Sequence, residues 1–141
     1  ILTMGAILFV AFSFWLMIAH GIFAVFMADA GVGKEGLELF LSGAGLAMLV
    51  VGTIAGALIA LAFYAITVIS LPLLVDRDLD FVTAIIVSLA TVRSNTVVML
   101  IWAVLIASAL FVAMLPLFVG LLVVLPVLGH ATWHLYRRVV V

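Results

Sequence analysis

The sequence has no cysteine, and only 8% of its 141 residues are charged. Without cysteine there is no disulfide, no thiolate metal site and no cysteine nucleophile, which excludes several classes of enzyme and metal centre. The charged fraction is far below the roughly one quarter of ordinary soluble domains, while 70% of the residues are hydrophobic. A water-soluble chain of this length could not hide so much apolar surface. The composition therefore predicts an integral membrane protein.

Charge of either sign is scarce and nearly balanced, with five Lys and Arg against six Asp and Glu. Because no basic tract is present, the sequence gives no support to nucleic-acid binding. We expect the partners to be membrane lipids and other integral membrane subunits. The sequence also lacks a glycine-rich phosphate loop, a serine nucleophile elbow and an HExxH motif. We therefore expect no enzymatic activity, no resident cofactor and no metal.

The first apolar run starts at Ile1 without an initiator Met, a basic leader or a cleavage site, so it predicts a span and not a signal peptide. We expect that a further N-terminal part precedes it. The first span is placed near residues 3–27, since about 20 apolar residues cross a bilayer. The charged and glycine-rich segment from Asp29 to Glu38 predicts a loop. A second span is placed near 45–71 and ends before Pro72.

The stretch from Thr96 to Tyr136 has no charged residue. At ~1.5 Å per residue it is about twice as long as a ~30 Å hydrocarbon core requires, which predicts two spans. Pro116 lies near its midpoint and suits the first turn of a new helix. We therefore place the third span near 96–115 and the fourth near 116–136.

A short amphipathic helix is expected near residues 79–93, lying on the membrane surface. Asp78 or Asp80 suits its N-cap, and Ser94 and Asn95 suit the N-cap of the following span. Its apolar residues recur at helical spacing: Phe81, Ile85, Leu89 and Val92.

The fold class predicted from these segments is all-α, a polytopic transmembrane helix bundle of four spans plus a short amphipathic interfacial helix, in one domain over residues 1–141. Four spans place Lys34 on one side of the membrane and all the arginines on the other: Arg77, Arg93, Arg137 and Arg138. By the positive-inside rule, both termini are then cytoplasmic. The expected location is the bacterial inner membrane.

Small residues form a stripe on the second expected span, at Gly45, Gly52, Gly56 and Ala60. Small residues four apart let two helix backbones approach closely, so this stripe predicts a helix-packing surface. Whether the other helix belongs to this chain or to a partner is left open, with packing inside the chain favoured.

His130 and His134 lie one helical turn apart near the end of the chain. Aromatic and basic residues lie between or just after the two histidines: Trp133, Tyr136, Arg137 and Arg138. Such residues anchor a span at the headgroup level. We favour the interfacial anchor, with the histidines as hydrogen-bonding groups. The alternative is a metal or haem site, although two histidines lack the third protein ligand of a catalytic zinc site.

His20 is expected inside the first span. An intramembrane ionisable residue is a functional candidate, yet a neutral histidine with one partner is much cheaper than a charge. We favour an interhelical hydrogen-bonding patch with Ser13, against the alternatives of a proton relay or a cofactor ligand.

Three segments resemble the DUF2189 family of bacterial integral membrane proteins: SLPLLVDRD from Ser70, SLATVRSN with MLIW up to Trp102, and LPVLGHATWHLYR from Leu125. The resemblance covers roughly residues 66–140, with one departure where the family has Asn-Pro and this chain has Asn95-Thr96. It implies no defined activity. A cytochrome c oxidase label on some members implies a respiratory membrane, and the family's longer N-termini agree with a preceding segment.

The function favoured by these observations is that of a non-catalytic accessory or structural subunit of a larger membrane complex, with a respiratory complex as the first candidate. One alternative is a component of a small-solute transporter or channel. A second is a haem- or quinone-binding electron carrier that uses His20 or the His130 and His134 face.

Overall fold

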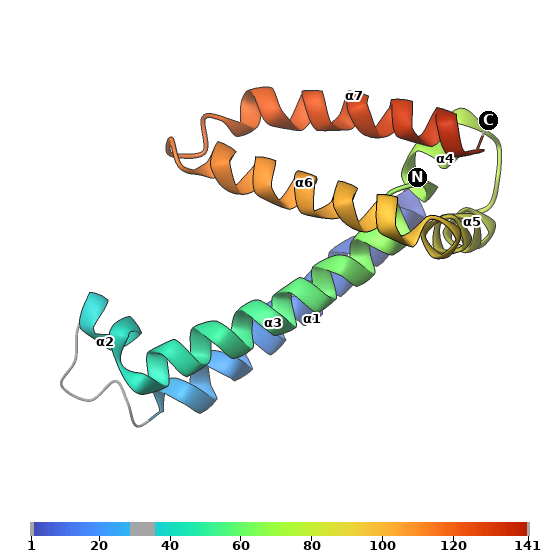
Figure 1. The fold of residues 1–141 in the computed structure, drawn as a ribbon. Coiled ribbons are helices and arrows are strands. Elements are labelled where there is room, and N and C mark those ends of the chain that lie inside the picture. The colour runs from blue at the N-terminus through green and yellow to red at the C-terminus, as the bar shows by residue number, and fades with distance from the viewer. Residues whose placement is uncertain (1, 29–35, 141) are drawn as a thin grey trace. The chain divides into compact units, whose positions relative to one another are not determined.

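The computed structural model describes residues 2–28 and 36–140, and every regular element within these ranges is a helix. The helices are α1 (Leu2–Met27), α2 (Leu37–Leu41), α3 (Gly43–Thr67), α4 (Ser70–Asp76), α5 (Phe81–Ser94), α6 (Thr96–Met114) and α7 (Leu121–Val140), as Figure 1 shows. The predicted loop is corrected at its end, because α2 begins at Leu37. Lys34 and the rest of that loop, 29–35, lie outside the described residues.

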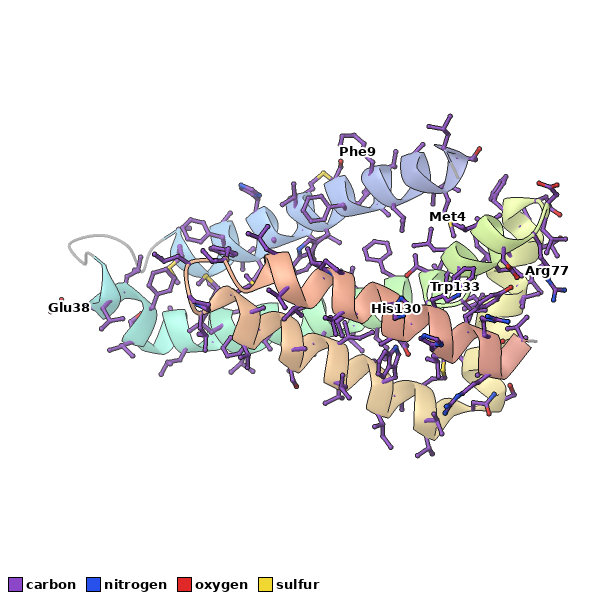
Figure 2. The ribbon with its side chains drawn as sticks, turned by 90° about the horizontal axis from the view of Figure 1, so that it is seen from above. Met4, Phe9, Glu38, Arg77, His130 and Trp133 are labelled. Atoms are coloured by element: carbon purple, nitrogen blue, oxygen red, sulfur yellow. The ribbon has the colours of Figure 1, made fainter. Side chains whose placement is uncertain are left out.

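Three helices among the described residues are long and apolar enough to cross a membrane: Leu2–Met27, the combined length of α3 and α4 from Gly43 to Asp76, and Thr96–Met114. Large apolar side chains on them face outward, such as Phe9 at 72% exposure and Leu58 at 65% (Figure 2). Helices that are apolar on every side suit a lipid surrounding and not water. α7 has comparable length, but its second half is polar.

The chain forms two compact units, residues 2–62 and residues 63–140, with α3 passing through both. In the first unit, Trp15 of α1 lies against Gly56 of α3, where an added Cβ would stand 3.2 Å from the indole ring. Ser42 caps the start of α3, since its hydroxyl accepts a hydrogen bond from the amide of Gly45 at 3.1 Å.

The predicted small-residue stripe has different surroundings at each position. A Cβ on Gly45 would overlap the backbone carbonyls of Leu39 and Phe40, so this glycine fits the turn from α2 into α3. Gly52 has open space around it. Only Gly56 is approached by a side chain of another helix. The contact between α1 and α3 at this stripe is therefore that of the Trp15 ring with Gly56, and Ala60 stays a prediction.

In the second unit, α6 and α7 form an antiparallel hairpin, and α4 and α5 pack at its far end from the turn (Figure 1). Figure 1 shows α5 nearly end-on while α6 lies in the plane of the picture, so α5 runs across the direction of α6. This crosswise course is the one expected of an interfacial helix beside a span. The buried core of the unit comprises Val68, Ile69, Leu73, Ala84, Met99 and Tyr136.

The turn between α6 and α7 lies at Pro116, as expected, but the new helix begins later, at Leu121. Leu117 and Phe118 adopt left-handed backbone conformations, with φ of 52° and 66°. Gly120 lies so close to the backbone of Ala113 that a Cβ would stand 2.6 Å from its carbonyl oxygen. The chain therefore reverses in a tight, irregular turn, and Pro116 belongs to it and not to α7.

The short helix predicted near residues 79–93 is present as α5, and its position at the membrane surface stays a prediction. Ala84, Ser88 and Thr91 are its buried residues, whereas Phe81, Ile85, Leu89 and Val92 are only partly buried. Small side chains on this face let α5 approach α4 closely. The hydrophobic periodicity therefore predicted the helix, and its buried side is formed by small residues.

Candidate functional site

The helix that begins as α3 is interrupted between Thr67 and Ser70, where α4 begins. Pro72 has no amide hydrogen to donate to the carbonyl of Val68, which favours a break at this level. At the break, the Ser88 hydroxyl of α5 donates to the carbonyl of Ala65 at 2.7 Å and accepts from the amide of Ile69 at 3.3 Å. In an unbroken helix these two backbone groups would bond each other. A buried hydroxyl from a second helix is thus inserted into the backbone ladder.

A second polar link joins the last helix to the same region. The Tyr136 hydroxyl of α7 donates a hydrogen bond of 2.8 Å to Asp76 Oδ2 at the end of α4. Tyr136 is completely buried. Arg77 Nε lies 3.9 Å from the same carboxylate oxygen, and both of these side chains are partly exposed. Tyr136 therefore differs from the expected headgroup anchor, since it faces the core and ties α7 to α4.

Aromatic side chains surround this link. Trp133 packs against Tyr136 with ring centroids 5.5 Å apart, and Figure 2 labels it on α7. Tyr64 near the end of α3 donates to the carbonyl of Met99 on α6 at 2.8 Å. Hydroxyl groups therefore join α3 to α6, α7 to α4, and α5 to the break between α3 and α4. Trp133, Arg137 and Arg138 remain predicted anchors, and both arginines are exposed.

Asp80 caps α5, as one of the two predicted alternatives. Its carboxylate accepts hydrogen bonds from the amide of Thr83 at 2.9 Å and from the Thr83 hydroxyl at 2.6 Å. The hydrogen bond from the Thr83 side chain and that from its amide hold the pKa of Asp80 below its usual value. The carboxylate therefore stays ionised and fixes the start of the helix. Asn95 precedes α6 but its side chain donates to Thr91 of α5 instead of capping α6.

His130 and His134 lie side by side on an exposed part of α7. Their Nε2 atoms are 3.2 Å apart, and their rings meet edge to face with centroids 4.7 Å apart. Each histidine thus has the other as its partner within hydrogen-bonding distance. Asp76, which lies at the same end of the unit, bonds Tyr136 instead.

His20 and Ser13 do not form the expected patch between helices. His20 Nδ1 is 2.7 Å from the carbonyl of Leu16, and the Ser13 hydroxyl donates to the carbonyl of Phe9 at 2.9 Å. Both partners belong to α1 itself. Hydrogen bonds to the preceding turn satisfy a polar side chain in an apolar helix without a second helix.

An open apolar groove of about 480 Å³ runs between the α3–α4 break and the α6–α7 hairpin. Its walls include Tyr64, Pro72, Leu110, Leu125 and Thr132. The hydroxyl of Tyr64 at its wall is already bonded to Met99. The groove is thus a surface for apolar groups, and in a bilayer a lipid chain is the available occupant.

Within residues 2–28 and 36–140, no group of three or more His, Asp or Glu side chains is arranged to hold a metal ion. Ser88, Tyr136 and Tyr64 each link one helix to another. Sequence reasoning identified Asp80 and the histidines but missed Ser88 and the partner of Asp76. The signal for Ser88 was present, since Ala84 and Ser88 form a small-residue pair four apart beside a proline break.

Several long apolar helices, linked by a few buried hydroxyl groups, define a helical integral membrane protein. The sequence matches the family described as "Predicted integral membrane protein (DUF2189)" over residues 1–76. The chain belongs to this family. The match covers a different part of the chain from the resemblance at 66–140, so only residues 66–76 are common to both. No curated protein and no solved structure matches the sequence.

Proposed function

We propose that the protein is a non-catalytic accessory or structural subunit of a larger complex in the bacterial inner membrane. The observation that supports this function is the use made of three hydroxyl side chains, two of them buried (Ser88 and Tyr136) and one partly buried (Tyr64). Ser88, Tyr136 and Tyr64 each bond a backbone or side-chain group of another helix. Polar groups that bond other helices stabilise the arrangement of those helices. A transport path instead needs polar groups that face a passage through the membrane.

The proposed topology has four spans, α1, α3, α6 and α7, with both termini in the cytoplasm. The hairpin of α6 and α7 supports the fourth span, because α7 returns along α6 (Figure 1). α7 has 20 residues, which at ~1.5 Å each give about 30 Å, the thickness of a hydrocarbon core. Arg137 and Arg138 in its last turn then lie at the cytoplasmic surface, together with Arg77 and Arg93.

A respiratory complex is the first candidate partner, because the family resemblance of the sequence implies a respiratory membrane. The outward apolar surface of α1 and α3 offers area for another membrane subunit, with the side chains of Phe9, Val25 and Leu58 strongly exposed. Lipid covers this surface in the isolated protein. In a complex, helices of the partner replace part of the lipid.

The test is purification of the native protein from its own membranes in a mild detergent, followed by identification of the proteins that co-migrate with it. We expect a stable assembly with other integral membrane proteins, including respiratory subunits. A control purification in a harsh detergent should release the chain alone. Recovery of the chain by itself in both detergents would contradict the subunit function.

A further inference from the structure

The paired imidazoles on α7 have a geometry beyond that of an anchor. His130 and His134 are both exposed and lie on one face of the helix, with Nε2 atoms 3.2 Å apart. Two nitrogens that bind one ion at ~2.0–2.1 Å in a tetrahedral arrangement lie roughly 3.3 Å apart. The observed separation is therefore close to that of two ligands on a common ion.

We propose that His130 and His134 form a two-imidazole site for a single divalent transition-metal ion. Imidazole nitrogen suits Cu²⁺, Zn²⁺ and Ni²⁺, and the usual order of affinities puts Cu²⁺ first among them. The hard cations Ca²⁺ and Mg²⁺ prefer oxygen ligands and are excluded from such a site. In the four-span topology the pair lies in the cytoplasmic half of α7, so a group from a partner subunit fills the other positions on the ion in the membrane, and water fills them in the solubilised protein.

The segment of α7 that carries both histidines is fixed by contacts on its other side. Trp133 lies between the two histidines in sequence and packs on Tyr136, and Tyr136 is completely buried and bonded to Asp76. The helix that presents both rings is therefore held on its opposite side, so little backbone freedom is lost when an ion binds. Figure 2 shows His130 and Trp133 on this helix.

His130 and His134 stand ten and six residues before Val140, the last residue of α7. The partial negative charge of the helix end acts only within the last turn, so it does not reach an ion at the pair. Arg138 lies one turn beyond His134 and is exposed, and its positive charge opposes a cation. The local charge therefore favours an ion that also takes an anionic ligand from outside the chain.

The same geometry argues against the haem alternative. Two axial ligands of one haem iron lie on opposite sides of it, which separates their nitrogens by about twice a metal–nitrogen bond, or ~4 Å. Residues four apart on one helix present their side chains on the same side.

Binding of an ion also changes the protonation of the pair. Both rings must then carry their proton on Nδ1, so that both Nε2 atoms are free to bind the ion. The ring that donates the hydrogen bond between the two Nε2 atoms therefore moves its proton from Nε2 to Nδ1.

The test uses the full chain in mild detergent with any affinity tag removed, and Cu²⁺ alone as the probe. We expect one ion per chain, with nitrogen hyperfine splitting from two imidazoles in the electron paramagnetic resonance spectrum. His130→Gln and His134→Gln should each reduce the splitting to one imidazole. Each should also weaken binding by more than about tenfold, since even loss of a group that only orients a ligand costs 10–100-fold. His20→Gln is the matched control and should change neither result.

A second measurement needs no variant. Diethyl pyrocarbonate modifies accessible imidazoles, and Zn²⁺ should protect His130 and His134 from it while leaving the rate at His20 unchanged. A wild-type spectrum with one or no imidazole nitrogen, unchanged affinity in His134→Gln, or no protection by Zn²⁺ would each overturn the proposal. The histidines would then be a hydrogen-bonded pair only. Neither result bears on the subunit function, which is tested by co-purification.

Discussion

Tyr136 Oη lies 2.8 Å from Asp76 Oδ2, so one hydrogen bond joins α7 to α4 across 60 positions of sequence. Tyr136→Phe removes the donor and keeps the ring. A hydrogen bond to a charged group contributes about 1.5–3 kcal/mol, and water can partly replace it at the half-exposed carboxylate, so we expect a loss of about 1–2 kcal/mol. The measurement is the free energy of unfolding in detergent micelles.

The matched control for that variant is Tyr64→Phe, which removes a hydrogen bond to the neutral carbonyl of Met99. Its expected loss is smaller, about 0.5–1.5 kcal/mol. If the two variants lose the same stability, the Asp76 carboxylate adds nothing to the link beyond a neutral acceptor.

Ser88→Ala should destabilise the protein because it leaves the carbonyl of Ala65 and the amide of Ile69 without the hydroxyl that joins them. Each unsatisfied buried group costs about 1–3 kcal/mol. The control is Ser94→Ala, whose residue is exposed and whose hydroxyl donates to the carbonyl of Thr91 and accepts from the side chain of the adjacent Asn95. We expect the control to stay within about 0.5 kcal/mol of the wild type. Equal stability of both variants would mean that the ladder closes without Ser88.

Gly56→Leu should disrupt the packing of α1 on α3, because even a Cβ at this position stands 3.2 Å from the Trp15 ring. Gly52→Leu should have a much smaller effect, since nothing lies within 4 Å of a Cβ there. Leu58→Ala trims an exposed side chain that lipid replaces. The measurement is the fraction of monodisperse protein recovered in mild detergent. Similar recovery of Gly56→Leu and Gly52→Leu would contradict the packing role of Gly56.

Gly120→Ala should strain the turn between α6 and α7, because its Cβ would stand 2.6 Å from the carbonyl oxygen of Ala113. That atom belongs to the backbone and cannot turn aside as a side chain would. We expect a loss of about 1–3 kcal/mol, typical of an overpacked site. Gly129→Ala, on the exposed part of α7 with nothing within 4 Å, is the control and should gain helix propensity. The thermal midpoints of the two variants should move in opposite directions.

The four-span topology is tested with single cysteines at positions 34 and 138. Because the chain has no cysteine of its own, each label reports one position. A membrane-impermeant thiol reagent added to intact cells should label position 34 and not position 138, and the pattern should reverse in inverted vesicles. Labelling of both positions from the same side would refute four spans.

The sequence was most informative where one physical requirement dominates. Apolar length predicted the helices that begin at Leu2, Gly43 and Thr96 to within two residues, since the bilayer thickness leaves little choice. Proline indicated both interruptions only approximately: α3 ends at Thr67 and the chain is helical again at Pro72 within α4, so the span does not end there, and Pro116 lies in a turn and does not begin α7. A charged residue beside an apolar run predicted the N-cap at Asp80.

The contacts between helices were less predictable because they depend on long-range geometry. Tyrosine near the end of a span is a typical headgroup anchor. The side chain of Tyr136 points into the core because its hydroxyl bonds Asp76 on another helix, which the sequence around Tyr136 does not reveal. Ser88 is one of several hydroxyl residues in apolar surroundings, and nothing in its own helix marks the backbone groups it would meet. The Gly45–Ala60 stripe is regular in sequence, yet one of its glycines serves a turn and another has no neighbour. Small residues permit close contact without specifying where it occurs.

The break between α3 and α4 has a consequence for the order of assembly. The break leaves the carbonyl of Ala65 and the amide of Ile69 without their helical hydrogen bond. The Ser88 hydroxyl that bonds both of them belongs to α5, which is synthesised later. Until then the amide of Ile69 and the carbonyl of Ala65 have only each other as hydrogen-bond partners within the chain. The bend is therefore completed only when α5 docks, and the second apolar segment enters the membrane as a straighter helix than the one it becomes.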